Sequence, residues 1–533
     1  MKFSFTLFCV LITFSVLGQF GVTTQPTEET FDGVTLIQPN ASKIAYLIDN
    51  NGDVRHQWEG NYTPGVGIYL LENGDLLRTG YTDDEYRYAG GQGGILEIVS
   101  WDGTVEWSYI ISSKTEKLHH DVVSLPNGNI LATVWEVKSY EEAIAMGRKP
   151  ELLDTALWPD KIVELEPIGR QEARIVWEWK VWDHLVQDFD ETKPNFGVVQ
   201  ENPGKIDVNY GSTDPDWNHI NALSYNSELD QIILSVPTFD EIWIIDHSTT
   251  TEEASSNTGG RSGKGGQILY RWGNQYAYKK GLASEKKLFY QHNPTWIKEN
   301  NQWKVLLFNN GRNRPVVKYS TVEKIELPVN DVGEYIINDG IFGPEKSEII
   351  YQAINPTDFF APIVSGAQLL GNNNILITNG VSSNIFEINP SKETVWAYKV
   401  PVNSKGETVC LNDSTAASGI LFRSYKYSYD YLGLLNLTNQ GEIGENCFPS
   451  IPLHVVANND PPRVFYGQNT LKVQAKSTIS EVLIYTLNGQ IISKISGINS
   501  KYSEHNLYLQ PGIVLAKVVS NSGAILSTKF VVR

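Results

Sequence analysis

The 533-residue chain is poor in three residue types: it contains 3 cysteines, 2 methionines and 9 histidines. Basic residues are also fewer than acidic ones, 43 against 61, which gives a formal charge of -18. Because no stripe of lysine and arginine can follow a phosphate backbone, we expect no nucleic-acid partner. Any bound anion must then meet positive charge that histidine, arginine and backbone N–H groups supply locally.

Long apolar runs are missing everywhere except at the N-terminus. There the run from Phe3 to Leu17 follows Lys2, and Val16 and Gly18 precede a plausible cleavage point. This run is too short for a membrane anchor and predicts a secretory signal peptide over residues 1–18. No later segment approaches the roughly twenty apolar residues of a transmembrane helix, so we predict an exported protein without a transmembrane segment.

The scarcity of cysteine limits both cross-links and metal sites. Cys9 lies in the predicted signal peptide, which leaves Cys410 and Cys447 in the mature chain. In an exported protein this pair predicts one disulfide, with two unpaired thiols as the alternative. Thiolate ligands are otherwise absent, and no histidines have the spacing of a zinc motif such as His-Glu-x-x-His. We therefore expect no metal and no cofactor.

Aromatic residues and turn formers are abundant, with Trp 14, Tyr 26, Phe 19, Gly 44 and Pro 24. This composition favours many short strands and predicts an all-β protein. A chain of this length contains two or more domains or one large repeat array.

A four-strand unit recurs between residues 41 and 440. Its first half is a hairpin with an Asn-Gly turn, as in residues 70–77 and 124–131, and its second half leads to tryptophan, as in residues 94–107 and 384–396. Asn-Gly between alternating apolar residues is a strong hairpin signal. Four strands at a period of roughly 50 to 70 residues are typical of propeller blades.

These units predict a six-bladed β-propeller over residues 19–449. Five of them begin near residues 67, 118, 217, 290 and 364, and the sixth combines residues 418–437 with residues 44–58. Closing a ring with strands from both ends removes its exposed edges. We expect the long insertions, residues 140–159 and 182–214, to roof one face of the ring.

The character of the sequence changes after Cys447. Residues 450–462 contain Asn458-Asn459-Asp460-Pro461-Pro462 and predict a linker. Residues 463–533 alternate apolar and polar side chains in short runs, which predicts a small C-terminal β-sandwich domain.

This C-terminal domain resembles the sorting domain of type IX secretion cargo. The resemblance rests on residues 482–490, 507–509, 511–514 and 529–533. It implies that the secretion machinery is a partner, and that the protein passes through the periplasm and is then secreted or attached to the cell surface. A carbohydrate-binding sandwich is the alternative.

Four of the nine histidines fall in three short segments, each of which heads a strand-like run. The segments are Leu118-His119-His120-Asp121, Asp216-Trp217-Asn218-His219-Ile220-Asn221 and Gln291-His292-Asn293-Pro294. A repeat fold builds a site in this way, from one polar residue per repeat. Histidine can act as nucleophile, acid or base near neutral pH, and with Asn221 and Asn293 it can hold an oxyanion. The alternative is that the histidines only cap strands around a solvent channel.

The same segments resemble the bacterial arylsulfate sulfotransferases over most of residues 40–440. The resemblance includes two further motifs, Glu241-Ile242-Trp243-Ile244-Ile245-Asp246 and Leu307-Phe308-Asn309-Asn310-Gly311. It implies a six-bladed propeller that transfers a sulfuryl group from an aryl sulfate donor to a phenolic acceptor without a nucleotide.

The resemblance also implies a role for each site residue. His292 would be the nucleophile that becomes transiently sulfurylated, and His219 with Asn221 would hold the sulfuryl oxygens. Either His119 or His120 would assist the phenolic oxygen, and the spacing does not choose between them.

The chain departs from the family at two positions. Pro237 stands where the family has an arginine, and we expect Arg312 or Arg314 to supply the missing charge. Asn293 stands where relatives more often have an acid, so it can orient His292 but cannot stabilise an imidazolium.

Two alternatives to the enzyme remain. One is a degenerate propeller that binds sulfated aryl or polysaccharide ligands, and the other is a purely structural surface protein. The oligomeric state is not predicted.

Overall fold

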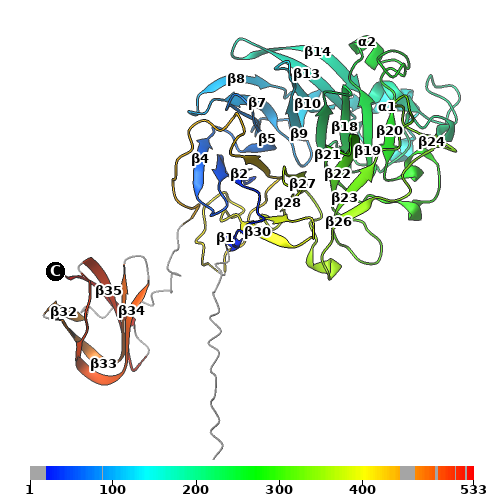
Figure 1. The fold of residues 1–533 in the computed structure, drawn as a ribbon. Helices are drawn as coiled ribbons and strands as arrows, with labels where there is room; N and C mark the ends of the chain where they lie inside the picture. The colour runs from blue at the N-terminus through cyan, green and yellow to red at the C-terminus, as the bar shows by residue number, and fades with distance from the viewer. Residues whose placement is uncertain are drawn as a thin grey trace, which may run out of the picture. The chain divides into compact units, whose positions relative to one another are not determined.

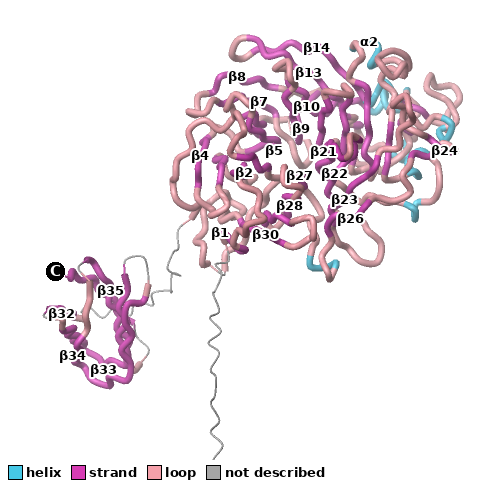
Figure 2. The backbone as a smooth tube through the Cα atoms, viewed as in Figure 1, coloured by secondary structure: helices cyan, strands magenta, loops and turns pink. Residues whose placement is uncertain are grey.

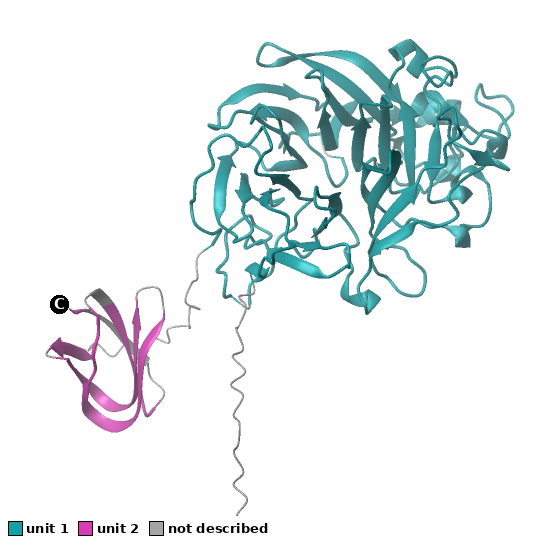
Figure 3. Ribbon diagram, viewed as in Figure 1, with its two compact units in different colours: residues 1–444 teal, residues 445–533 magenta. Residues whose placement is uncertain are grey.

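The computed structural model describes residues 20–444, apart from 87 and 414, and residues 462–532, apart from 468, 487–489, 511 and 523–524. The chain divides into two compact units, residues 1–444 and residues 445–533 (Figure 3). The predicted signal peptide and almost all of the predicted linker lie outside the described residues. No helix within these described ranges is long and apolar enough to cross a membrane.

Strands dominate both units, and helices are few and short (Figure 2). Helices α1 (Tyr140–Ala145) and α2 (Thr251–Ala254) each begin with a capping box, at Ser139 and Thr250. Such a box satisfies the free N–H groups of a first turn. Single 3-10 turns occur at Pro150–Leu152, Val181–His184, Val199–Glu201, Gln275–Tyr278, Ala283–Glu285 and Pro356–Asp358. The all-β prediction is confirmed.

The described part of unit 1 contains six large antiparallel sheets (Figure 1). Sheet 1 consists of β5 (Pro64–Leu70), β6 (Leu76–Tyr81), β7 (Gly94–Val99) and β8 (Val105–Ile110). Sheet 2 consists of β9 (Glu116–Ser124), β10 (Ile130–Glu136), β13 (Asp160–Ile168) and β14 (Glu172–Lys180). Sheet 3 consists of β17 (Ala222–Asn226), β18 (Gln231–Val236), β19 (Glu241–Asp246) and β20 (Tyr270–Trp272).

Of the remaining three sheets, two also contain strands from the beginning of the chain. Sheet 4 consists of β21 (His292–Glu299), β22 (Gln302–Asn309), β23 (Thr321–Glu326) and β26 (Glu348–Tyr351). Sheet 5 consists of β27 (Gly366–Leu369), β28 (Ile375–Asn379), β29 (Asn384–Ile388), β30 (Thr394–Lys399) and β1 (Gly21–Thr24). Sheet 6 consists of β31 (Tyr425–Ser428), β2 (Gly33–Ile37), β3 (Ile44–Ile48) and β4 (Val54–Glu59). Two-residue strands are Lys138–Ser139, Ala156–Leu157, Leu185–Val186, Ile206–Asp207, Ile337–Asn338 and Ile341–Phe342.

Two sheets join the beginning and the end of unit 1. In sheet 6, β31 pairs with β2, and in sheet 5, β30 pairs with β1. Residues 418–437 and 44–58 are expected from the sequence to share a sheet, and the structure places β31, β3 and β4 in one sheet. β1 and β2 are not predicted from the sequence, because each pairs with a strand from the other end of unit 1.

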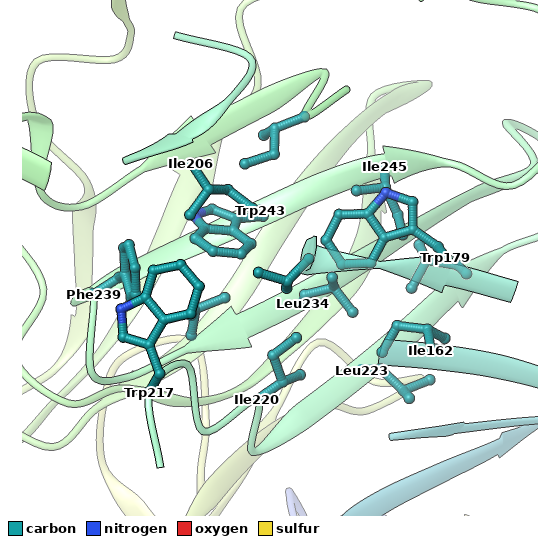
Figure 4. Close-up of a cluster of buried hydrophobic side chains, with 14 of the residues drawn as sticks. Ile162, Trp179, Ile206, Trp217, Ile220, Leu223, Leu234, Phe239, Trp243 and Ile245 are labelled. Atoms are coloured by element: carbon teal, nitrogen blue, oxygen red, sulfur yellow. The ribbon is translucent and has the colours of Figure 1, made fainter. Parts of the chain in front are cut away.

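A large apolar core lies between sheets 2 and 3 (Figure 4). Trp179 of sheet 2 and Trp243 of sheet 3 are both fully buried there. Burying one large side chain stabilises the fold by roughly 1.5–3 kcal/mol. Both predicted insertions contribute to this core, through Leu157 and through Ile206. Both insertions therefore pack against the core of unit 1.

Buried ion pairs connect strands within the sheets and between them. Glu97 of β7 pairs with Arg78 of β6, and Glu387 of β29 pairs with Lys426 of β31. Glu241 of β19 pairs with Arg271 of β20, and both side chains are completely buried. A buried charge is costly without a partner, so each pair favours the arrangement of strands that brings its two charges together.

Unit 2 is one antiparallel sheet with strands β32 (Arg463–Gly467), β33 (Thr470–Thr486), β34 (Ile491–Asn506), β35 (Gly512–Ser520) and β36 (Ile525–Val532). β33 pairs with β32 through its first residues and with β35 through its later ones, on either side of a register shift after Gln474. Apolar side chains such as Val473 and Val482 form its core. A two-sheet sandwich stays a prediction.

We predict that Arg271→Met lowers the free energy of unfolding by about 3–5 kcal/mol, because it leaves the buried Glu241 carboxylate without a cation, with only the indole N–H of Trp243 to bond it. The matched control is Arg174→Met, which breaks an ion pair with Glu166 whose side chains are 65% and 38% exposed. That change should cost less than about 1 kcal/mol. Urea denaturation followed by tryptophan fluorescence measures both variants, and equal costs would contradict the prediction.

Candidate active site

The structure brings the three histidine segments together. The ring centroids of His120 and His219 are 4.5 Å apart. The ring of Tyr290 lies 6.0 Å from that of His219 and 6.2 Å from that of His292. The ring of Phe422 lies 6.3 Å from both His120 and His292. Three neighbouring sheets and the segment before β31 thus meet at one place.

The backbone at this place is left-handed at several non-glycine residues. His120, His219, Tyr290 and Asn293 have φ values of 48°, 54°, 65° and 51°. The ladders of β9 and β21 also shift register beside His120 and Asn293. A bulge interrupts the alternation of side chains along a strand and can turn a residue towards a site, at a cost of roughly 1–3 kcal/mol for the strained conformation.

Asn310 determines which nitrogen of His292 is free. The Nδ2 group of Asn310 donates to the carbonyl oxygens of Ala361 and Val364, at 2.7 and 2.8 Å. Its Oδ1 atom therefore faces His292 Nδ1, at 2.8 Å, and accepts a hydrogen bond from it. Because Nδ1 carries the proton, Nε2 of neutral His292 keeps its lone pair. Asn310 belongs to the Leu307-Phe308-Asn309-Asn310-Gly311 motif, but the sequence alone predicts no role for it.

Burial lowers the pKa of His292 to about 3, and the charges of His219 and Arg423 act in the same direction. The hydrogen bonds to Asn310 and to the backbone of Tyr290 oppose this shift only in part. At neutral pH His292 is therefore an uncharged imidazole with a nucleophilic nitrogen.

His219 has the opposite character. Burial alone would lower its pKa, but the charge and hydrogen bond of Asp216, with the charge of Asp160, outweigh burial and raise it. The Nδ1 atom of His219 bonds to Asp216 Oδ2. His219 can therefore carry a positive charge next to the neutral His120 and close to Tyr290.

The structure assigns different positions to His119 and His120. The His119 ring stacks on Trp135 at 4.0 Å, and its Nε2 atom lies 3.2 Å from Asp160 Oδ1. Its Nδ1 atom lies 2.9 Å from His120 Nδ1. Burial, the largest cause, lowers the pKa of both residues, to about 3 for His119. His120 faces His219, and His119 lies behind it.

His120 also needs a glycine beside it. A side chain at position 91 would overlap the His120 imidazole, and Gly91 has a φ of 79°. The carbonyl of Gly91 accepts a hydrogen bond from the backbone N–H of His120 at 2.8 Å.

The two predicted amides are bonded to backbone groups. Asn221 Nδ2 donates to the carbonyl of Gln291 at 3.0 Å. Asn293 Oδ1 accepts from the N–H of Ala367 at 3.1 Å. Asn221 thus supports the backbone just before His292, and Asn293 connects sheet 4 to sheet 5.

The two predicted arginines lie at the edge of the site or away from it. Arg312 is exposed, and its guanidinium carbon lies 4.5 Å from the ring centroid of Tyr290. Arg314 Nη2 bonds to Thr321 at 3.3 Å and lies 3.8 Å from a carboxylate oxygen of Glu323.

Arg423 is a site residue that the sequence does not predict. It is 3% exposed, and its Nη2 atom lies 2.6 Å from Asp121 Oδ2. Arg423 lies before β31 and outside every motif identified in the sequence. Its signal is a charged residue directly after the buried pair Leu421-Phe422.

Two further predictions concern metals and the disulfide. Among the residues with a described position, no group of three or more histidine, cysteine, aspartate or glutamate side chains could hold a metal ion. Cys410 is disulfide-bonded, whereas Cys447, its predicted partner, lies outside the described residues.

Comparisons with solved structures give distant similarities. A protein of unknown function from Bacteroides caccae is 11% identical with a TM-score of 0.39, and the match covers 74% of this chain and 98% of that one. A streptogramin B lyase is 11% identical with a TM-score of 0.34, covering 72% and 84%. The Swd1 β-propeller domain of Myceliophteria thermophila is 10% identical with a TM-score of 0.37, covering 72% and 90%.

No curated protein matches the chain. A family model does match it, over residues 21–410, which include all four sequence-predicted histidines. The chain therefore belongs to the arylsulfotransferase (ASST) family.

Proposed function

We propose that the protein is an exported aryl-sulfate sulfotransferase that transfers a sulfuryl group from a phenolic sulfate ester to a phenol through His292, on a closed six-bladed propeller. The observation that carries this proposal is the pairing of a neutral His292, whose Nε2 is free, with a cationic His219 in the same site. Imidazole is a competent nucleophile whose sulfurylated form keeps enough reactivity for a second transfer.

In the first step, His292 Nε2 attacks the sulfur of the ester. The N–S bond forms as the bond between sulfur and the phenolic oxygen breaks, and the leaving oxygen takes a proton from His120. In the second step, His120 takes the proton of the acceptor phenol, the phenolic oxygen attacks sulfur, and the electron pair of the N–S bond returns to Nε2. Such proton transfer contributes about 10² to 10⁴-fold to the rate.

The charge distribution supports these roles. Burial and the neighbouring cations hold the pKa of free His120 well below its ordinary value. An anionic ester opposes those cations and makes a protonated His120 more favourable. Cationic His219 meets the sulfuryl oxygens, because sulfuryl transfer, like phosphoryl transfer, depends on positioning and on stabilising equatorial oxygens.

We place the entrance of the site beside Tyr290 and Arg312. The four histidines are at most 9% exposed, whereas Tyr290 is half-buried and Arg312 above it is exposed. A cationic side chain over an aromatic ring at the entrance suits an aryl ester, which carries both an anionic group and a ring.

The second candidate function is binding of sulfated aryl or polysaccharide ligands without turnover. The observation that favours it is Pro237 at the position where the family has an arginine. Loss of a fixed bidentate partner for the sulfuryl oxygens weakens catalysis more than binding.

We also propose that residues 1–18 direct export and that unit 2 is the sorting domain read by the type IX secretion machinery. The described strands of unit 2 include the residues of the quoted motif around Val482 and Ile484, whose side chains belong to its core.

We predict that His292→Ala lowers the rate of phenol release from para-nitrophenyl sulfate by about 10³-fold or more, because it removes the nitrogen that attacks sulfur. The release is measured by absorbance, with a phenol as acceptor. His56→Ala, which removes a histidine of β4 bonded to Trp101, is the control and should keep full activity. Absence of phenol release by the wild type would refute transfer, and saturable ester binding without release would support the second candidate.

We predict that kcat/KM falls at alkaline pH as His219 loses its proton. The pKa of His219 is raised above its ordinary value of 6.5, so its charge is complete at lower pH and is lost as the pH rises through that raised pKa. The pKa of His292 is about 3, so no loss should occur on the acid side down to about pH 4. His219→Gln should lower kcat/KM by about 10²-fold and remove the part of the alkaline limb that follows the raised pKa of His219. An unchanged alkaline limb in this variant would exclude His219.

We predict that a chain lacking residues 463–533 stays in the periplasm, whereas the full chain reaches the cell surface or the medium. Fractionation and immunoblotting of a host with the type IX machinery measure this. A chain lacking residues 1–18 is the control and should stay in the cytoplasm. Normal secretion without residues 463–533 would rule out the sorting role.

A further inference from the structure

Arg423 is a buried cation that the transfer steps above do not use. It lies just before β31, with 3% of its surface exposed, and its Nη2 atom is 2.6 Å from Asp121 Oδ2. Asp121 directly follows His120 in β9. The ion pair therefore holds the guanidinium next to the histidine that exchanges protons with the phenol.

Phe422 locates the guanidinium relative to His292. The guanidinium carbon of Arg423 lies 4.5 Å from the ring centroid of Phe422, and that ring lies 6.3 Å from both His120 and His292. The positive charge of Arg423 also lowers the pKa of both histidines. An anion bonded to His292 Nε2 would therefore feel the charge of Arg423 in a buried environment, where screening is weak.

Asp121 holds Arg423 in a fixed orientation. Its Oδ1 atom accepts from the hydroxyl of Tyr69 at 2.9 Å, and its Oδ2 atom accepts from the N–H of Leu223 at 3.1 Å. These bonds prevent the carboxylate from turning. A guanidinium has five N–H donors, more than one carboxylate oxygen can use, so Arg423 can bond to Asp121 and to a further anion at once.

The arginines considered from the sequence are less suitable. Arg314 is tied to Thr321 and lies within 3.8 Å of Glu323. Arg312 lies over Tyr290 and is exposed to solvent, whereas Arg423 is buried.

We propose that Arg423 binds the oxygens of the sulfuryl group during its transfer, supplying from the segment before β31 the guanidinium that is absent at Pro237. This inference rests on the proposed function. It makes the site specific for aryl esters that carry a tetrahedral anionic head, and not for the corresponding neutral phenols.

The test measures binding separately from turnover. In the His292→Ala background, isothermal titration calorimetry compares para-nitrophenyl sulfate with para-nitrophenol. Arg423→Lys keeps a positive charge beside Asp121 but removes the planar set of guanidinium N–H donors. It should weaken binding of the ester at least about 10-fold and leave the affinity for the phenol unchanged. With His292 present, the same change should lower kcat by about 10²-fold.

Arg314→Lys is the matched control, because it also replaces a guanidinium that lies near a carboxylate. It should change ester affinity less than about twofold. If Arg423→Lys does not fold, the double variant Arg423→Gln with Asp121→Asn removes both buried charges together and should show the same selective loss. Ester affinity equal to that of the control, in either variant, overturns the proposal. A different result is that the wild type releases no phenol while the Arg423 variants selectively lose ester affinity. This result would refute transfer but support the anion-binding role of Arg423.

Discussion

The site depends on carboxylates that lie behind its cations. Asp216 bonds to His219, and Asp121 lies 2.6 Å from Arg423. A buried cation without such a partner would lose its proton or destabilise the fold. In a chain with a net charge of -18, the buried positive charge near His292 comes from His219 and Arg423, each of which lies beside a carboxylate.

The same arrangement explains why His292 and His219 have different charges although both are buried. His219 bonds to a carboxylate, and His292 bonds to the amide oxygen of Asn310. The carboxylate raises the pKa of one imidazole, and the amide leaves burial to lower the pKa of the other. A pair of like groups thus acquires two functions from their neighbours.

The sequence predicts this site only in part. The three histidine segments could be found because each heads a repeat unit, and repeats converge. The choice between His119 and His120 could not be made, because a bulge in β9 interrupts the alternation on which it depends. Arg423 could not be found, because its importance comes from Asp121, about 300 residues earlier in the chain. β1 and β2 were missed because they pair with strands from the other end of unit 1.

The position of Arg423 connects the site to the last part of unit 1 to be synthesised. Arg423 precedes β31 of sheet 6, but its carboxylate partner lies in sheet 2. Tyr425 of β31 lies beside Tyr69 of β5, with 3.2 Å between their hydroxyl oxygens, and the Tyr427 hydroxyl accepts from the N–H of Leu70 at 3.1 Å. β31 thus packs against sheet 1 in the same arrangement that brings the guanidinium to Asp121. The anion-binding charge is then complete only when the two ends of unit 1 have come together, so a truncated or misfolded chain would not present a finished site.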